Sequence, residues 1–310
     1  MDEIDFTLSK ILMVNSRISY SEIADTFGLS VNSIYKRIKS LVELGIIRNF
    51  KTRLSFLNFP HTTNVILFGR SPEKDKKVLM DKIGNHECVY NVTQASGELF
   101  YFHAFSRNLR DLDSIVSIIK EEAKINNLTV ALDKNSPSAF PIELIEINYL
   151  NVDYLIINSL RENSRKTISD IADEIEVSTK TVTRHLNRLI KEQLIHFTID
   201  WYPDKTSELI SFIIINSKPE KGFNKINLIE NFKKIEKNLF HHYRFINLTE
   251  LMLLCVWTSS MKELQKIEGF LNEYDLESVE VTILLEGKIY PIWIDKYLDE
   301  KIEEIKKIEL

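Results

Sequence analysis

The sequence predicts an α+β protein made of two copies of one plan, a winged helix-turn-helix module followed by a ferredoxin-like βαββαβ domain. Three observations predict this fold class. A segment near the start of the 310-residue chain recurs in its second half. Both copies of that segment show the spacing of a helix, a short turn and a helix with a polar face. Both are followed by apolar runs in the order strand, helix, strand, strand, helix, strand.

The recurrence has a constant offset and no gap. Ile23 corresponds to Ile171 and Ile47 to Ile195, an offset of 148 residues in both cases, and the tripeptide Ile-Ala-Asp is identical in the two copies. An ungapped match over about thirty positions predicts an internal duplication.

The composition is that of an ordinary folded protein, with 44% hydrophobic and 27% charged residues, 8 Gly and 7 Pro. These values exclude collagen-like, linker-like and disordered chains. The two cysteines, Cys88 and Cys255, are too few for a disulfide scaffold and are typical of a reducing compartment. The longest apolar run, residues 251–257, is too short to cross a bilayer, and the acidic start is unlike a signal peptide. We therefore expect a cytoplasmic protein.

Caps and turns place the helices of the first module. Ser19 or Ser21 can cap its second helix, and Gly28 supplies a tight turn at the end of that helix. Ser30 can cap a third helix, which has an apolar stripe on one face and polar residues on the other. The run at residues 50–56 alternates as a β-wing would.

The regions after the two modules follow the same order of elements. In the first copy we expect a strand at 62–69, a helix at about 73–83, strands at 88–93 and 98–105, a helix around 109–125 and a strand at 128–132. In the second copy we expect a strand at 208–217, a helix at about 224–238, strands at 240–247 and 250–258, a helix at about 261–274 and a strand at 277–285. Residues 292–310 predict a charged closing helix. The expected domains are 1–58, 60–147, 148–203 and 205–310, the last including that helix.

The net charge of −5 argues weakly against a nucleic-acid partner, but the charge is unevenly distributed. The segment from residue 30 to residue 53 contains several basic residues and a single acidic one, and the segment 178–197 is also basic. A helix dense in Lys, Arg, Asn, Ser and Thr opposite its apolar stripe suits the major groove of DNA. The candidate DNA-binding residues are Ser30, Asn32, Ser33, Tyr35, Lys36, Arg37, Lys39, Lys51, Arg53, Ser178, Lys180, Thr181, Thr183, Arg184, His185, Asn187 and Arg188. The alternative is a winged-helix module that binds protein through the same basic faces.

The N-terminal segment with Ile23-Ala24, Gly28-Leu29-Ser30, Arg37-Ile38-Lys39 and Gly45-Ile46-Ile47 resembles the start of Lrp/AsnC (leucine-responsive/feast-famine) transcription regulators. In that family a winged helix-turn-helix is joined to a βαββαβ effector and oligomerisation domain. The resemblance implies a DNA-binding transcription regulator. It also implies a pseudo-dimer, paired through its αβ sheets, in which one chain carries what the family usually assembles from two.

The resemblance also suggests where an effector would bind. The family pattern Thr-Gly-x-x-Asp-Tyr lies between the second and third strands, where this sequence has Gly97 and Glu98 in the first copy and Glu250 in the second. These three are the candidate effector-binding residues. The Asp position, however, is Phe100 in one copy and Met252 in the other. Because an amino-acid ammonium group needs a carboxylate or backbone groups to hold it, we do not expect amino-acid sensing in the family's usual manner.

The run His-His-Tyr-Arg at residues 241–244 is the most chemical-looking cluster. It resembles, faintly, the siroheme-decarboxylase relatives built on the same architecture, so such an enzyme is an alternative reading. Neighbouring strand residues point to opposite faces, so these two histidines cannot easily ligate one metal. His86 and Cys88 have no second pair at metal-site spacing, and phosphate-loop and hydrolase motifs are missing from the sequence. We expect no enzyme activity, no cofactor and no metal.

The expected function is sequence-specific binding of double-stranded DNA. The helices at 30–41 and 178–189 would enter successive major grooves, about one helical turn apart. Because their polar faces differ, we expect an asymmetric site. We also expect a small-molecule effector as a possible partner and at least a dimer of chains.

Overall fold

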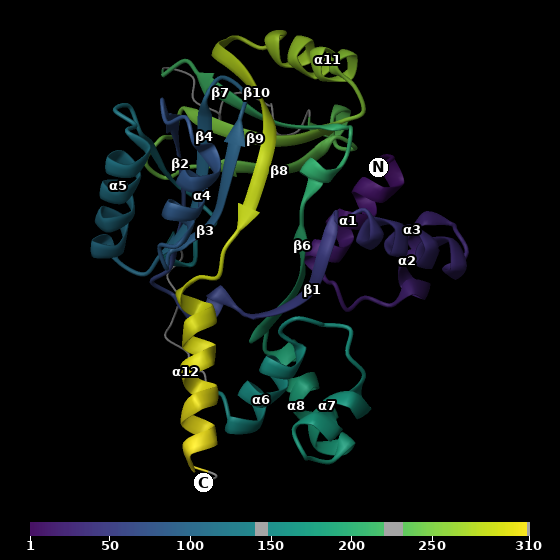
Figure 1. Ribbon diagram of the computed structural model, residues 1–310. Coiled ribbons are helices and arrows are strands. Elements are labelled where there is room, and N and C mark those ends of the chain that lie inside the picture. Colours follow the sequence, from purple (N-terminus) through teal and green to yellow (C-terminus); the bar gives the residue numbers. More distant parts are fainter. Residues whose placement is uncertain (140–147, 220–231, 309–310) are drawn as a thin grey trace. The chain divides into compact units, whose positions relative to one another are not determined.

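The computed structural model describes residues 1–139, 148–219 and 232–308, and the described chain forms two compact units (Figure 1). The sheet unit comprises Met1–Phe6, His61–Phe140 and Pro203–Tyr290. The helical unit comprises Thr7–Pro60, Pro141–Tyr202 and Pro291–Leu310. Within the described ranges, no helix has both the length and the apolar character that a membrane crossing requires.

The sheet unit contains one antiparallel sheet of eight strands in the order β5-β2-β4-β3-β10-β7-β9-β8. Its first half consists of β2 (Thr63–Arg70), α4 (Lys76–Gly84), β3 (Val89–Ala95), β4 (Leu99–Ser106), α5 (Leu109–Ala123) and β5 (Thr129–Leu132). Its second half consists of β7 (Leu209–Ser217), β8 (Leu239–Arg244), β9 (Leu251–Thr258), α11 (Met261–Asn272) and β10 (Leu276–Ile289). In each half the strands lie in the order fourth, first, third, second, as in a ferredoxin-like domain. The predicted fold class is confirmed.

Each half of the sheet has two outer strands, and both of them contact an outer strand of the other half. β10 pairs with β3 from Leu284 opposite Ala95 to Ile289 opposite Asn91. At the other ends, β5 and β8 are joined by a single bridge between Asp133 and Phe245. A buried apolar cluster with members from both halves lies where the halves face each other. The predicted pairing of the two copies through their sheets is therefore present within one chain.

Two predicted elements differ in extent from the structure. The helix expected at 224–238 lies mostly outside the described residues, and the described part of that range contains only a short 3-10 helix at Phe232–Lys234. The strand expected at 277–285 continues to Ile289 in β10. The extension is the part of β10 that pairs with β3, a long-range contact that no local pattern encodes.

A partly buried chain of hydrogen bonds runs across the first half of the sheet. The amide nitrogen of Asn64 on β2 donates to the carboxylate of Asp133 at 2.9 Å, so its oxygen accepts from Nε2 of His103 on β4, at 2.5 Å. The ring of His103 lies 6.5 Å from that of Tyr243 on β8. Burial, together with the charge of nearby His241, lowers the pKa of His103 from the ordinary 6.5 to about 4.

This shifted pKa makes the stability of the sheet unit depend on pH. The unfolded chain takes up a proton at His103 near pH 6.5, whereas the folded chain keeps the imidazole neutral down to about pH 4. The free energy of unfolding is therefore unaffected by protonation of His103 above pH 6.5. As the pH falls from 6.5 toward 4, the free energy of unfolding decreases by about 3 kcal/mol in total, because only the unfolded chain binds the proton. We expect His103→Gln, which keeps a polar side chain but does not titrate, to show a shallower loss over this range. Urea unfolding at several pH values measures the difference, and parallel curves for the two proteins would contradict the prediction.

The helical unit contains both copies of the repeated module. The first copy comprises α1 (Glu3–Val14), α2 (Tyr20–Phe27), α3 (Val31–Glu43) and β1 (Ile47–Leu54); the first residues of α1 belong to the sheet unit. The second comprises α6 (Asn151–Leu160), α7 (Ile168–Glu174), α8 (Thr179–Lys191) and β6 (Ile195–Trp201). The closing helix α12 (Trp293–Ile308) packs against α6, where the hydroxyls of Tyr154 and Tyr297 are 3.1 Å apart.

Local chemistry explains why these helices begin and end where they do. Ser19 caps α2 in a capping box with Glu22, and Ser30 caps α3 by accepting from a backbone N–H. Gly28 ends α2 with φ of 63°. In the second copy the equivalent position is Glu176, whose φ is 55°. The same left-handed turn thus forms with and without a glycine, which indicates that packing of the module holds this backbone conformation.

The alternating run after α3 is a strand, but it is not a β-wing hairpin. β1 pairs antiparallel with β6, the equivalent strand of the second copy, from Ile47 opposite Trp201 to Leu54 opposite Ile195. The predicted wing strand is therefore present, and its partner is the equivalent strand of the other copy. The pairing satisfies backbone N–H and C=O groups that a lone strand would leave open at its edge.

Candidate nucleic-acid interface

The first candidate reading helix, α3, has a buried stripe and an exposed polar face. Ile34, Ile38 and Leu41 are buried. The exposed side chains on the opposite face are Asn32, Tyr35, Lys36 and Lys39, whereas Ser33 and Arg37 are half-buried. Tyr35 is 49% exposed, and its ring lies edge-on to that of Tyr20 on α2 at 6.1 Å.

The second candidate reading helix, α8, repeats this arrangement with different side chains. Ser178 caps it as Ser30 caps α3. Lys180, Thr183, Arg184 and Asn187 are exposed, and Thr181 is half-buried. The Thr183 hydroxyl donates to the Thr179 carbonyl at 2.8 Å, which leaves the side chain folded onto the helix. The two reading helices thus present unlike chemical groups.

Two residues of α8 that the sequence placed in the interface point into the module instead. His185 is 7% exposed, and its Nδ1 lies 2.8 Å from the carboxylate of Asp153 on α6. The guanidinium of Arg188 donates to the other oxygen of the same carboxylate. The prediction of His185 as a DNA contact is therefore wrong, and Arg188 has its charge engaged by a buried acid.

Asp153 is a residue that the sequence analysis missed. It is fully buried and also accepts a bond from the backbone N–H of Leu150 at 2.6 Å, which closes the first turn of α6. A signal was available, because Asp5 occupies the equivalent position in the first copy. A recurring acidic residue on an otherwise apolar helix indicates a buried polar partner.

The pair Asp153 and His185 also orients an exposed residue of the reading face. Nη2 of Arg184 lies 3.2 Å from Nε2 of His185. A guanidinium can only donate, so Nε2 is the acceptor and Nδ1 carries the proton that is given to Asp153. The rest of the Arg184 guanidinium stays exposed to solvent.

Lys51 and Arg53, which the sequence placed on a DNA-contacting wing, have acidic partners in the paired strands. Nζ of Lys51 bonds Glu162 and lies 3.7 Å from Asp200. A guanidinium nitrogen of Arg53 is 3.6 Å from the same Asp200. Both side chains are less than one-fifth exposed. Glu162 and Asp200 thus engage the charges of both residues in the absence of DNA, and a DNA contact at Lys51 and Arg53 stays a prediction.

The candidate effector residues lie in two turns of the sheet unit. Gly97 and Glu98 form the turn between β3 and β4 with φ of 67° and 63°. The guanidinium of Arg70 donates to the Gly97 carbonyl and lies 2.9 Å from Glu280. The exposed Glu250 precedes β9, and its carboxylate accepts from the Thr249 hydroxyl at 2.8 Å. An effector site at these residues stays a prediction.

The His-His-Tyr-Arg run lies on β8, and its two histidines have different surroundings. The ring of His241 is 4.4 Å from that of Tyr243, whereas the ring of His242 is 5.6 Å from that of Phe232. Burial lowers the pKa of His242.

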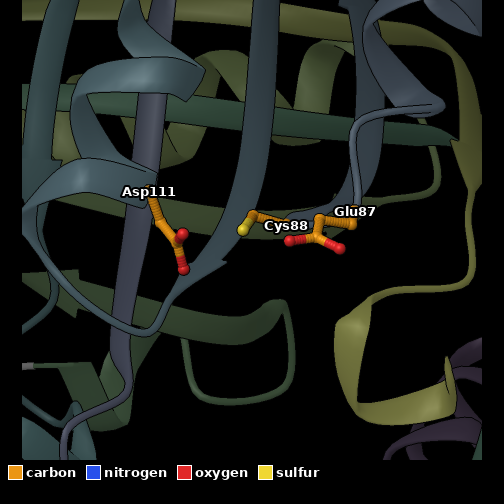
Figure 2. Close-up of side chains that lie close together, drawn as sticks. All are labelled: Glu87, Cys88 and Asp111. Carbon is orange, nitrogen blue, oxygen red and sulfur yellow. The ribbon is translucent and has the colours of Figure 1, made fainter. Parts of the chain in front are cut away.

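Within the described ranges, one cluster has the composition of a metal site, and Figure 2 shows its members Glu87, Cys88 and Asp111. The guanidinium of Arg107 already binds both carboxylates, with its Nε donating to Asp111 at 2.7 Å and Nη2 donating to Glu87. Burial, with the nearby Asp111 carboxylate, raises the pKa of the Cys88 thiol to about 12. Because both carboxylates are bonded to this guanidinium, the cluster is better described as an ion-pair network around Arg107.

Comparison with known proteins relates the chain to transcription regulators. A family model described as winged helix-turn-helix DNA-binding matches residues 1–48 and 151–196, one match in each copy. An uncharacterised HTH-type transcriptional regulator of Pyrococcus abyssi is 36% identical over 104 residues, which are 30% of this chain and 65% of that protein. Another from the same organism is 28% identical over 46% of this chain and 95% of its own length. The chain thus aligns with about two-thirds of the first relative and with nearly all of the second.

A solved structure shares the whole architecture. The siroheme decarboxylase NirDL aligns with 98% of this chain and 100% of its own chain, with a TM-score of 0.54 and 13% identity. At that identity the likeness concerns the fold alone.

The chain is therefore a winged helix-turn-helix protein related to HTH-type transcriptional regulators, as the sequence predicted. Its particular form is a tandem duplication, in which both the helical module and the ferredoxin-like half occur twice in one polypeptide.

Proposed function

We propose that this chain is a transcription regulator that binds double-stranded DNA at a two-part, asymmetric site. One observation carries the proposal: two Ser-capped helices, α3 and α8, present exposed basic faces from the same compact unit. Helix N-termini with free polar and basic side chains are the elements that enter a major groove in this class of module.

The exposed residues suggest a different reading chemistry in each half of the site. Asn32 and Tyr35 on α3 suit adenine and the thymine methyl group, whereas Arg184 on α8 suits the two acceptors of guanine. Lys36, Lys39 and Lys180 suit phosphates. A site with unlike halves follows from these differences.

Selection of bound duplexes from a random pool, read at two salt concentrations, tests this function. We expect an enriched sequence with two unlike half-sites about one helical turn apart. Enrichment of a perfect palindrome would contradict the asymmetry. Recovery of no preferred sequence at either salt concentration would contradict sequence-specific binding.

Lys36→Ala should weaken binding and flatten its salt dependence if Lys36 contacts a phosphate. Each neutralised phosphate contributes about 0.9 to the slope of log K against log salt concentration, so the slope should fall by about that amount. Lys120→Ala on α5, which removes the same charge from an exposed site in the sheet unit, is the control. Equal slopes for Lys36→Ala and the unaltered protein would remove Lys36 from the interface.

We propose further that the protein acts in the cytoplasm, without catalysis and as a homo-oligomer of at least two chains, and that a small molecule modulates it through the sheet unit. The kinship with transcription regulators supports this over the siroheme-decarboxylase alternative and over a module that binds only protein. Addition of haem precursors tests whether the protein is such an enzyme. We expect the visible absorption spectrum to be the same with the unaltered protein and with His242→Ala. A band that appears with the unaltered protein and is lost in His242→Ala would support the enzyme. Binding of random duplex at low salt tests the protein-only reading.

A further inference from the structure

The two winged-helix modules meet at a seam where equivalent residues contact each other. The side-chain oxygens of Ser16 and Ser164 are 2.6 Å apart, and both residues are fully buried. The two serines are 148 positions apart, which is the offset of the repeat. A residue that touches its own counterpart lies on a twofold axis, so an approximate twofold axis relates the two modules at this point.

The residues that follow the two serines form reciprocal bonds across the seam. Nη1 of Arg17 donates to the carbonyls of Ser164 and Lys166, the latter at 2.9 Å. Nη2 of Arg165 donates to the carbonyl of Ile18 at 2.8 Å. Arg17 and Arg165 are equivalent in the repeat, and so are Ile18 and Lys166. Each guanidinium thus holds the other module by its backbone.

Backbone bonds fix the same seam to the ribbon formed by β1 and β6. The N–H of Ser16 donates to the carbonyl of Phe197 at 3.3 Å, and the N–H of Ser164 donates to that of Phe50 at 2.7 Å. The guanidinium of Arg165 also stacks over the ring of Tyr20, 4.3 Å from its centre. The seam and the ribbon therefore join the loops that precede α2 and α7.

The choice of arginine at the seam has a geometric consequence. Within the described parts of the chain, all the hydrogen bonds that these two guanidinium groups make go to backbone carbonyls, and neither forms an ion pair with a carboxylate. Burial lowers the pKa of both groups, and the charge of Arg165 lowers that of Arg17 further. Because the two guanidinium groups carry like charges, they do not attract each other. What they contribute at the seam is geometry: each planar guanidinium directs its N–H groups toward fixed backbone carbonyls.

We propose that Arg17 and Arg165 are positioning residues that clasp the two modules and set the separation of α3 and α8, and with it the half-site spacing that the protein accepts. This inference rests on the proposed function. The loops that the clasp joins lead directly into α2 and α7, and these helices pack against α3 and α8. Loss of the clasp leaves both modules folded but lets their mutual orientation vary.

Binding to a series of duplexes tests the clasp. The selected site is synthesised with its spacer shortened or lengthened in single base-pair steps, each of which turns one half-site by about 35°. For the unaltered protein we expect affinity to fall at least about tenfold when the spacer changes by two base pairs. For Arg17→Gln/Arg165→Gln we expect a fall of less than about threefold, with unchanged affinity for a single half-site. Arg17→Lys/Arg165→Lys, which keeps the charge but removes the planar fork, should lie between the two and guards against misfolding of the Gln variant.

A second measurement needs no DNA. Spin labels on cysteines introduced at Lys39 and Lys191 report the distance between a site within α3 and the last residue of α8, since both positions are exposed and the native Cys88 and Cys255 are buried. We expect a narrow distance distribution for the labelled parent and a broader one after the arginine substitutions. Unchanged spacing preference and unchanged distribution in the Gln variant would overturn the clasp and leave the proposed function standing. If the parent binds no duplex, the proposed function fails, and the label distribution alone decides whether the clasp exists.

Discussion

Asp153→Ala should lower the free energy of unfolding of the helical unit by about 3–5 kcal/mol, the range for removing one partner of a buried ion pair. The carboxylate is fully buried and binds His185, Arg188 and the N–H of Leu150. Its loss leaves a guanidinium whose Nε is already buried without a partner. It also removes the acceptor that fixes the tautomer of His185.

Two control variants separate the causes. Asp173→Ala removes the same charge from an exposed position on α7 of the same module and should change stability by less than about 0.5 kcal/mol. Asp153→Asn keeps the shape and one acceptor, so it should fall between the two. Urea unfolding followed by circular dichroism measures all three proteins. An Asp153→Ala protein as stable as Asp173→Ala would show that the buried cluster is not what holds α6 to α8.

The same cluster shows how far sequence reasoning reaches. Apolar spacing and Ser caps predicted α3 and α8 because helix periodicity and capping are local properties. That spacing also places His185 three residues after Val182 and four before Leu189, which is the buried stripe. The chemical type of His185 suggested the interface, whereas its position in the helix period indicates the buried face, and the period is the better guide here.

Contacts between the copies were beyond local reasoning. The resemblance to the Lrp/AsnC family implied paired sheets, but not that β1 would pair with β6 or that Lys51 and Arg53 would meet Asp200 there. Strand pairing depends on partners far away in the sequence. An alternating run has the same pattern whether it pairs with a neighbouring strand in a hairpin or with a strand of the other copy in a ribbon. The seam at Ser16 and Ser164 lies in loops, where neither periodicity nor capping gives a signal.

Reversing charge on one reading helix should separate two-part binding from single-module binding. We expect Lys180→Glu/Arg184→Glu to lower affinity for the full site by about 10²–10⁴-fold, because it removes the gain from a second linked module. Affinity for a duplex with only the half-site of α3 should change by less than about threefold, the small remainder being a long-range effect of the added negative charge. Fluorescence anisotropy with labelled duplexes measures both quantities.

The equivalent charge reversal on α3 tests whether both copies of the module bind DNA. Lys36→Glu/Lys39→Glu alters exposed residues of α3 and should have the opposite preference, sparing only the half-site of α8. Each variant then keeps one half of the recognition, which a chain with a single functional module cannot do. If one pair of substitutions abolished binding to every duplex and the other pair had no effect, one module would carry all of the recognition. The second basic face would then serve the fold or a protein partner, and the two-part site would have to be given up while binding of DNA by the remaining module was kept.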